Sequence, residues 1–195
     1  MNVSEKLSTP ISDGESEQAP LRLDLGCGPN KKEGYIGLDR ISFDGVDHVV
    51  DLACCRWPFD DASVADAHTS HFVEHLTSVE RVHFCNELYR VLKSGAKCTV
   101  IVPHWASSRA YGDPTHQWPP VGEMWFMYLR QEWRDQNAPH TDIKHWPEGF
   151  ACDFDATWGY GLNPAIGARN AEFQQFAANH YREAIYDLHA TLIKR

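Results

Sequence analysis

Short apolar runs, separated by glycine-rich or polar turns, dominate the first half of the chain. Buried strands have this length and composition. The runs of strand length occupy residues 21–25, 35–40, 46–52, 63–70 and 97–103. Their number and spacing predict a sheet near the N-terminal end of a folded domain.

One helix is predicted between the fourth and fifth runs. Thr77 and Glu80 form a capping-box pattern at its start, and Gly95 supplies a stop signal at its end. Apolar residues recur at helical spacing between these signals, at Val79, Val82, Cys85, Tyr89 and Leu92. Strands that alternate with crossovers build a parallel, doubly wound α/β sheet.

Residues 104–149 break this rhythm. The segment is dense in Trp, Pro and His, with one predicted helix over 123–133, so we interpret it as an inserted lid that faces the substrate. From 150 to 160 apolar and polar positions alternate strictly, which predicts a strand with one wetter face. A helical stripe over 170–182 and an alternating strand over 185–194 complete the chain.

Composition and charge narrow the class of protein. The 195 residues, 43% of them hydrophobic, suit one globular domain, which we assign to residues 21–195. The 18 Lys plus Arg against 27 Asp plus Glu give a net charge of -9, which disfavours a nucleic-acid partner, although a local basic groove would still permit one. Residues 1–20 are rich in Ser, Glu and Pro and predict a disordered tail without a signal peptide.

Two further features bear on where the protein acts. No apolar run has the length of a membrane span, so no membrane partner is expected. The six cysteines have no regular spacing, which favours reduced thiols in the cytoplasm. The sequence does not indicate the oligomeric state.

Candidate chemistry begins at the turn after the first strand. Gly26 and Gly28 allow a ligand to approach the backbone closely there. The dinucleotide fingerprint needs another glycine three positions later, but Lys31 occupies it, so a pyrophosphate cradle is poorly supported. Asp24 would repel a pyrophosphate and suits a cationic or amine-bearing ligand instead.

Acidic residues close the next two predicted strands. Asp39 closes the second strand, where a carboxylate can accept both hydroxyls of a ribose. Asp51 closes the third strand, within reach of an adenine amino group. A strand-end Asp is on its own more often a turn former or a helix cap, but the ordered spacing of these carboxylates favours a nucleoside site.

Together these motifs resemble the class I S-adenosylmethionine-dependent methyltransferases, specifically small, type 11-like members. The resemblance covers residues 21–103 through LDLGCGP, GxDR, DL, WPF, HFVEHL and ELYRVLKSGA. It implies a Rossmann-like sheet of seven strands, mostly parallel with an antiparallel last strand, and S-adenosyl-L-methionine as cofactor. Only about ten residues separate Gly28 from Asp39, too few for a crossover helix, so we expect a loop there.

The resemblance also implies the contacts of the cofactor. Its methionine part would lie along Asp24, Gly26, Cys27 and Gly28. Its nucleoside would be held by Asp39, Asp51 and Leu52. Its sulfonium would be bordered by Ser70, His71 and Phe72.

A rival interpretation comes from the letters HFVEH, residues 71–75, which match the H-x-x-E-H signature of inverzincin metalloproteases. On a helix, His71 and His75 would share one face and could bind zinc. No third ligand is indicated, and the methyltransferase resemblance explains the segment's position. We therefore expect no metal site and keep a zinc hydrolase as the lesser alternative.

The sequence constrains the residues that would act on the methyl acceptor less than those that would bind the cofactor. Methyl transfer requires alignment of donor and acceptor, and a base only if the acceptor carries a proton of high pKa. Candidate catalytic residues follow the fifth strand, at His104, Tyr111, Asp113 and His116. The letters GDP can equally form a plain turn. Five Trp in residues 104–149 could wall an apolar or aromatic acceptor pocket, or form the lid's own core.

The sequence thus predicts a cytoplasmic S-adenosylmethionine-dependent methyltransferase that modifies a small-molecule acceptor by in-line transfer. The first alternative is a catalytically silent S-adenosylmethionine-binding partner protein. The second is the zinc hydrolase.

Overall fold

The computed structural model describes residues 19–141 and 149–195. The expected disordered tail over 1–20 and the stretch 142–148 of the expected lid therefore lie outside the described residues, apart from 19 and 20. The strands are β1 (Arg22–Leu25), β2 (Ile36–Asp39), β3 (His48–Val49), β4 (Val64–Ser70), β5 (Leu92–Pro103), β6 (Phe154–Leu162) and β7 (Ile185–Lys194). The helices are η1 (Val73–His75), α1 (Ser78–Val91), α2 (Arg109–Gly112), α3 (Glu123–Met127), α4 (Gln131–Asn137), α5 (Pro164–Gly167) and α6 (Ala171–His180).

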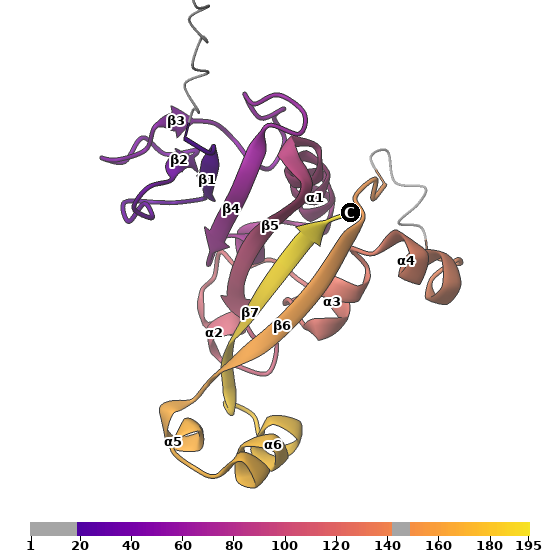
Figure 1. The fold of residues 1–195 in the computed structure, drawn as a ribbon. Coiled ribbons are helices and arrows are strands. Elements are labelled where there is room, and N and C mark those ends of the chain that lie inside the picture. Colours follow the sequence, from indigo (N-terminus) through magenta and orange to yellow (C-terminus); the bar gives the residue numbers. More distant parts are fainter. Residues whose placement is uncertain (1–18, 142–148) are drawn as a thin grey trace, which may run out of the picture.

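The strands form one seven-stranded sheet in the order β3-β2-β1-β4-β5-β7-β6 (Figure 1). Strands β1 to β5 are parallel, and β7 runs antiparallel to both of its neighbours, β5 and β6. The sequence-based expectation of a mostly parallel sheet with an antiparallel last strand is confirmed. Chain order reverses between β1 and β4, and ligands of such sheets bind at the carboxyl ends of the strands beside this reversal.

Crossovers on the β3 side of the sheet are unusually short. No helix occurs among the described residues between β1 and β2, β2 and β3, or β3 and β4, so the expected loop after the glycine turn is confirmed. Residues 23–25 of β1 are nonetheless all buried, as in a central parallel strand. The core of the sheet includes Leu23, Leu25, Leu38, Val64, Leu88, Val100 and Phe154.

Helices α1 and α3 pack on the same face of β6. Tyr89 of α1 meets Phe154 edge-on at 5.3 Å between ring centroids, and Phe126 of α3 stacks on Trp158 at 5.9 Å. Phe154 and Trp158 are four residues apart in a strand and therefore point to one face. Thr77 and Glu80 form the predicted capping box of α1. Val79, assigned to its apolar stripe, is 57% exposed.

Three of the boundaries predicted from the sequence are wrong. The third strand has two residues instead of 46–52, so Asp51 lies beyond it. Helix α1 ends at Val91 because the chain enters β5 directly, and Gly95 (φ 75°) lies within that strand where its register against β4 shifts. The helix predicted over 123–133 is two helices, because Arg130 is extended and the Leu129 carbonyl accepts from Phe154 N at 3.0 Å.

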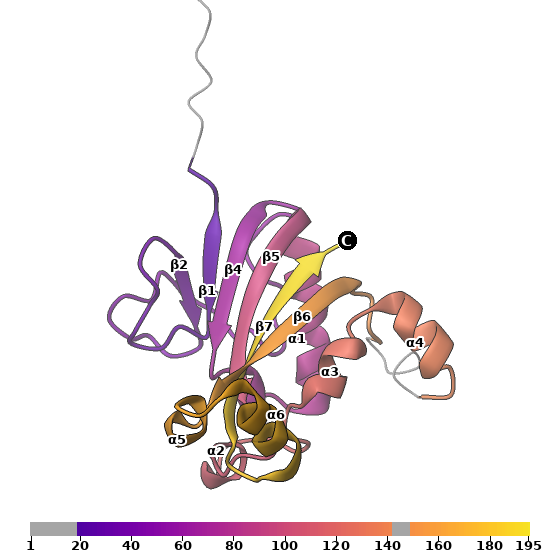
Figure 2. The same ribbon diagram turned by 60° about the horizontal axis from the view of Figure 1, so that its bottom comes forward.

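The β6–β7 connection carries α5 and α6 beyond the carboxyl edge of the sheet (Figures 1 and 2). The predicted helix over 170–182 is confirmed as α6, capped by Asn170, which accepts from Phe173 N at 2.9 Å. Its apolar stripe, however, buries only Ala177, and Phe176 is 48% exposed. Helix α6 therefore buries little apolar surface against the rest of the protein.

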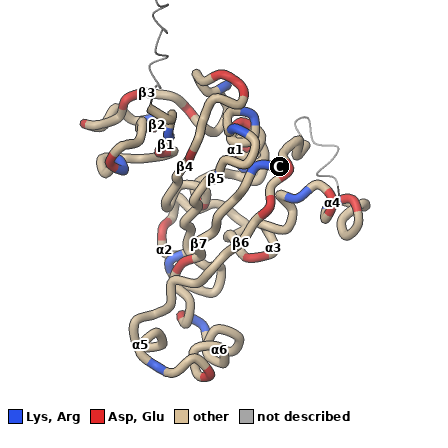
Figure 3. Tube along the Cα trace, in the orientation of Figure 1, with Lys and Arg blue, Asp and Glu red and all other residues tan. Residues whose placement is uncertain are grey.

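Charged residues of both signs occur throughout the described chain. Lys and Arg are scattered among Asp and Glu along the described chain (Figure 3). Among the helices that the structure describes, none is long and apolar enough to cross a membrane. The six cysteines are free thiols.

Candidate functional site

A cavity of about 620 Å³ opens at the carboxyl ends of β1 and β2, a volume typical of small-molecule sites. We term it the glycine-turn cavity. Its lining comes from the turn after β1, the end of β2, the loop after β3 and the segment after β4. Sequence-predicted residues in the lining are Gly26, Asp39, Asp51, Leu52, His71 and Phe72. Further lining residues include Arg40, Ile41, Phe43, His75, Glu80 and Gln117.

Gly26 has no room for a side chain. Its φ is +68°, and a Cβ there would lie 2.3 Å from the ring of Phe72. The amides of Gly26 and Cys27 both donate to the carbonyl of Leu38, at 2.9 and 3.1 Å. The turn is thereby held against β2 while Phe72 covers it.

The carboxylate of Asp39 is oriented by two backbone amides. Oδ2 accepts from Gly28 N and Oδ1 accepts from Ile41 N, both at 2.9 Å. A carboxylate oxygen has two lone pairs, so each oxygen can still accept a hydroxyl proton from the cavity. Asp51 is oriented in the same manner, because its Oδ1 accepts from Ala53 N at 2.9 Å.

Asp24 and Cys27, assigned to the cofactor's methionine part, do not line this cavity, and neither does Gly28. Asp24 is buried, with Oδ2 accepting from Lys32 N and Oδ1 paired with His68 Nδ1, both at 2.7 Å. It therefore fastens the loop after β1 to β4. Burial, with the nearby Asp24 and Asp39 carboxylates, raises the pKa of the Cys27 thiol to about 11.

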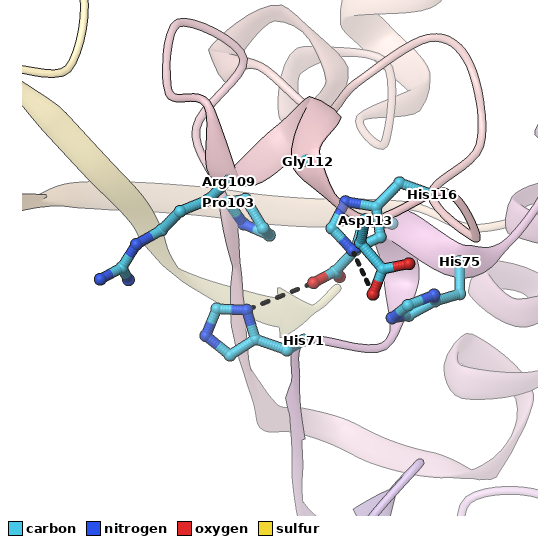
Figure 4. A pocket seen from close by; sticks show the side chains of 8 residues that line it. His71, His75, Pro103, Arg109, Gly112, Asp113 and His116 are labelled. Atoms are coloured by element: carbon cyan, nitrogen blue, oxygen red, sulfur yellow. Dashed lines mark ion pairs between the residues drawn. The ribbon is translucent and has the colours of Figure 1, made fainter.

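A second cavity of about 390 Å³ lies after β4 and β5 (Figure 4). We term it the histidine cavity. It is lined by His71, Glu74, His75, Pro103, Arg109, Gly112, Asp113 and His116. His71 and His75 line both cavities, so the two spaces adjoin. Figure 4 shows His75, Asp113 and His116 beside one another, with His71 facing them across the space. Ser70 ends β4 just before this segment.

The HFVEH segment is not the helix that the zinc-hydrolase alternative required. His71 has a left-handed φ of 53°, and only Val73–His75 form a single 3-10 turn. The helix on which His71 and His75 would share one face is therefore absent from this segment. His71 Nδ1 lies 3.3 Å from Glu74 Oε1, and this carboxylate raises the pKa of the His71 imidazole against the opposing effect of burial.

The four candidate catalytic residues divide between two places. Asp113 and His116 line the histidine cavity, whereas His104 and Tyr111 line a cavity of about 400 Å³ against the end of α6. His104 is buried. Its Nε2 lies 3.1 Å from Glu123 Oε1, and its Nδ1 accepts from Ala106 N at 3.3 Å. Both of its ring nitrogens are therefore engaged within the protein.

The four tryptophans of the expected lid that the structure describes do not line the glycine-turn or the histidine cavity. Trp105 lines the cavity beside α6 and is 51% exposed, and Trp118 is 77% exposed. Trp125 packs against the hydrophobic core, and Trp133 meets Tyr128 edge-on at 4.9 Å. Trp146 lies outside the described residues.

Arg81 of α1 joins these parts and was not among the residues predicted from the sequence. Its buried guanidinium donates to the carbonyls of Val73, Pro119 and Gln117 at 3.1, 2.6 and 3.3 Å. It thereby holds the turn that carries Glu74 and the loop that carries His116 in one position. An Arg in a helical sequence usually occupies an exposed position, so nothing in the sequence indicated that Arg81 is buried.

No protein-family model and no curated protein sequence matches the chain. A solved S-adenosylmethionine-dependent methyltransferase from Archaeoglobus fulgidus is similar in structure, with a TM-score of 0.60 at 18% identity. That similarity covers 91% of this chain and 87% of the other.

Two further solved structures are similar to the chain. One is the 1,6-didemethyltoxoflavin-N1-methyltransferase of Burkholderia thailandensis with bound 1,6-didemethyltoxoflavin and S-adenosylhomocysteine (TM-score 0.53, 11% identity, 90% of this chain, 71% of that one). The other is the geranyl diphosphate C-methyltransferase of Streptomyces coelicolor A3(2) with Mg²⁺, geranyl diphosphate and S-adenosyl-L-homocysteine (TM-score 0.50, 13% identity, 91% of this chain, 74% of that one). The chain shares the fold of these enzymes.

Proposed function

Because the chain has the class I S-adenosylmethionine-dependent methyltransferase fold, we propose that it is a methyltransferase that modifies a small molecule in the cytoplasm. The observation that carries this proposal is the glycine-turn cavity, with the oriented Asp39 carboxylate on one side and Phe72 against Gly26 on the other. A cationic nucleoside fits such a donor set, since the cavity offers fixed carboxylates and a glycine backbone.

The residues present suit S-adenosyl-L-methionine. Asp39 would accept the ribose hydroxyls, and Asp51 and Leu52 would border the adenine. Gly26, with the adjoining turn through Cys27 and Gly28, would support the methionine part of the cofactor. Asp24 would contribute indirectly, because its hydrogen bond from Lys32 N fixes the loop that follows this turn. Ser70, His71 and Phe72 would lie on the sulfonium side, where the glycine-turn cavity meets the histidine cavity.

When bound, this cofactor supplies a methyl group on a positively charged sulfur. An acceptor atom would use its lone pair to form a bond to that carbon, and the sulfur would keep the electron pair of the carbon–sulfur bond. A proton on the acceptor passes to a base or to water. The chain's own contribution is alignment of the acceptor and exclusion of water, which the wall formed by Phe72 and the loop held by Arg81 would provide.

The acceptor is proposed to occupy the histidine cavity, because that cavity adjoins the glycine-turn cavity at His71 and His75. His116 and Asp113 are the candidate proton acceptors there. His104 and Tyr111 would serve only an acceptor that reaches the cavity beside α6, since they do not line the histidine cavity. A small molecule fits a space of about 390 Å³, and the net charge of -9 disfavours a nucleic acid.

Transfer of a labelled methyl group tests this function. The purified chain is incubated with methyl-labelled S-adenosyl-L-methionine and fractions of small metabolites, proteins and nucleic acids. The proposal expects label in a small-molecule fraction, and expects Gly26→Ala to abolish it. Label only in protein or nucleic acid would contradict the small-molecule acceptor. Cofactor binding without transfer to any fraction would favour the silent binding protein.

A further inference from the structure

Glu74, His75 and His116 meet at the wall of the histidine cavity. Each offers one ligand atom, and these atoms lie within 4.8 Å of one another. Glu74 and His75 belong to η1, whereas His116 comes from the loop after α2, 41 positions further along the chain than His75. The histidine rings meet edge-on at 4.7 Å between centroids.

Glu74 is buried, and the protein offsets its charge only in part, through His71 and the more distant Arg81. The residue is 4% exposed, and neither carboxylate oxygen has a hydrogen-bond partner among the described residues. Its nearest ionic neighbour is His71 Nδ1 at 3.3 Å, and that imidazole is itself half exposed. A buried carboxylate costs several kcal/mol unless it is paired, hydrogen-bonded or bound to a metal. A cation beside Glu74 would supply the missing partner.

The hydrogen bonds around His75 fix which ring nitrogen carries a proton. The Thr115 hydroxyl donates to Asp113 Oδ1 at 2.7 Å, so toward His75 Nδ1, 2.9 Å away, it acts as an acceptor. His75 Nδ1 must then carry the hydrogen, which leaves the Nε2 lone pair of the neutral ring unused. Metal-bound histidines are typically oriented through such a bond from the other nitrogen toward a carboxylate.

His116 has the same tautomer. Its Nδ1 lies 3.3 Å from the carbonyl of Ala110, and a carbonyl can only accept. Nδ1 therefore carries the hydrogen and the lone pair of Nε2 remains. Asp113 Oδ2 lies 4.0 Å from that Nε2, so a carboxylate stands close enough to add negative charge beside it. Both imidazoles are thus prepared as ligands by bonds on their far nitrogens.

We propose that Glu74, His75 and His116 bind one divalent transition-metal ion, with Zn²⁺ as the ion that fits this donor set best. Two imidazoles and one carboxylate favour zinc and its neighbours over Mg²⁺ and Ca²⁺, which prefer oxygen ligands. Zinc bonds of about 2.0–2.1 Å require ligand atoms roughly 3.4 Å apart. Small side-chain rotations would close the present separation of at most 4.8 Å.

The site deepens the proposed methyltransferase function, on which its role toward the acceptor rests. Three protein ligands leave a fourth position open, as in catalytic zinc sites, and that position would face the histidine cavity. An acceptor oxygen or nitrogen held there would lose its proton more readily. His116 is then a ligand in place of a base. The proposed metal site departs from our expectation of no metal site. Its three ligands also differ from the His71 and His75 pair of the hydrolase alternative.

Calorimetric titration with Zn²⁺ in the absence of S-adenosylmethionine tests the site independently of transfer. One zinc per chain is expected for the unaltered protein, with affinity reduced at least tenfold by Glu74→Gln and by His116→Ala. His180→Ala, in an exposed histidine on α6, is the matched control and should bind as the unaltered chain does. Mg²⁺ should give no saturable heat. Absence of saturable zinc binding, or zinc binding by both ligand variants as tight as by the unaltered chain, would overturn the proposal.

Two further measurements separate a lost ligand from a lost fold. Thr115→Val removes the hydroxyl that orients His75 and leaves all three ligands, so we expect an intermediate loss of zinc affinity with an unchanged unfolding midpoint. Substitution with Co²⁺ should give the visible absorption of a four-coordinate site with nitrogen ligands. Binding abolished by His71→Ala but retained in His116→Ala would instead assign the metal to the H-x-x-E-H pair. A metal site without methyl transfer would leave this inference standing and reject only the proposed function.

Discussion

The amide of Gly28 donates a hydrogen bond of 2.9 Å to Oδ2 of Asp39, which joins the turn after β1 to the carboxyl end of β2. The glycine-turn cavity lies beside this junction. The Asp39 carboxylate thus has two roles. It fixes the turn after β1, and its remaining lone pairs can accept hydrogen bonds from a ligand in the cavity.

Replacement of Asp39 tests both roles. Asp39→Asn keeps the size of the side chain but places an amide group where one oxygen accepted a backbone or ribose hydrogen. We expect at least tenfold weaker binding of S-adenosyl-L-methionine by calorimetry, equivalent to about 1.4 kcal/mol or more. Asp44→Asn removes the same charge from an exposed loop position and is the control. Equal affinity of the two variants would rule out the assigned role of Asp39.

Gly26→Ala tests the close approach of Phe72. The new methyl group would meet the Phe72 ring at 2.3 Å, and the positive φ of 68° adds backbone strain, which costs of order 1–3 kcal/mol. Gly95→Ala is a matched control, because φ there is 75° and no atom lies within 4 Å of the added Cβ. Both variants should lose stability in urea unfolding. Only Gly26→Ala should also lose cofactor binding, and retained binding would show that the turn tolerates a side chain.

Arg81→Met tests the connection between η1 and the loop after α2. The substitution keeps much of the side-chain volume but removes the donor to the carbonyls of Gln117 and Pro119, and one of the two donors to the Val73 carbonyl, which still accepts from Leu76 N. We expect a loss of about 2–4 kcal/mol in the free energy of unfolding. Arg56→Met, whose side chain is 70% exposed, should change stability by less than about 1 kcal/mol. A similar loss in both variants would show that the buried contacts of Arg81 contribute little.

Acid should weaken the fold through Glu87. Burial raises the pKa of this carboxyl, but hydrogen bonds from Arg90 and from Trp57 N outweigh it and hold the pKa below the ordinary 4.5. A carboxyl with a lowered folded-state pKa stabilises the protein above the unfolded value. That contribution disappears as the pH falls through the folded value.

Glu87→Gln should therefore be less stable than the unaltered chain at pH 7, by about 1–2 kcal/mol. The difference should shrink as the pH falls below 4.5, since Glu87 of the unaltered chain then takes up a proton. Urea unfolding across pH 7 to 3 measures it, with exposed Glu33→Gln as the control. A difference that is constant over this range would contradict the assignment.

Much of the sheet was predictable because its signals are local. The apolar runs indicated the positions of six of the seven strands, although β5 begins five residues earlier and β6 four residues later than predicted. Thr77 and Glu80 marked the start of α1. The third strand was predicted too long because β3 is an exposed edge strand whose extent depends on β2. The break between α3 and α4 also has a distant cause, namely the bond from Phe154 N to the Leu129 carbonyl.

The strand ends that form the candidate site were predictable from the sequence, whereas the contacts between its loops were not. The order of Gly26, Asp39 and Asp51 along the chain placed them at one edge of the sheet, and they line one cavity. The letters HFVEH named Glu74 and His75 but implied a helix that a left-handed His71 prevents. The meeting of η1 with His116 depends on loops and on Arg81, for which sequence periodicity carries no information.

Calorimetric titration of S-adenosyl-L-methionine into the purified chain measures occupancy of the glycine-turn cavity. We expect one site per chain with micromolar affinity, competed by S-adenosylhomocysteine and weakened in Asp39→Asn but not in Asp44→Asn. The absence of saturable heat with either compound would contradict the proposed function, because a methyltransferase fold without an occupied glycine-turn cavity cannot perform the proposed reaction.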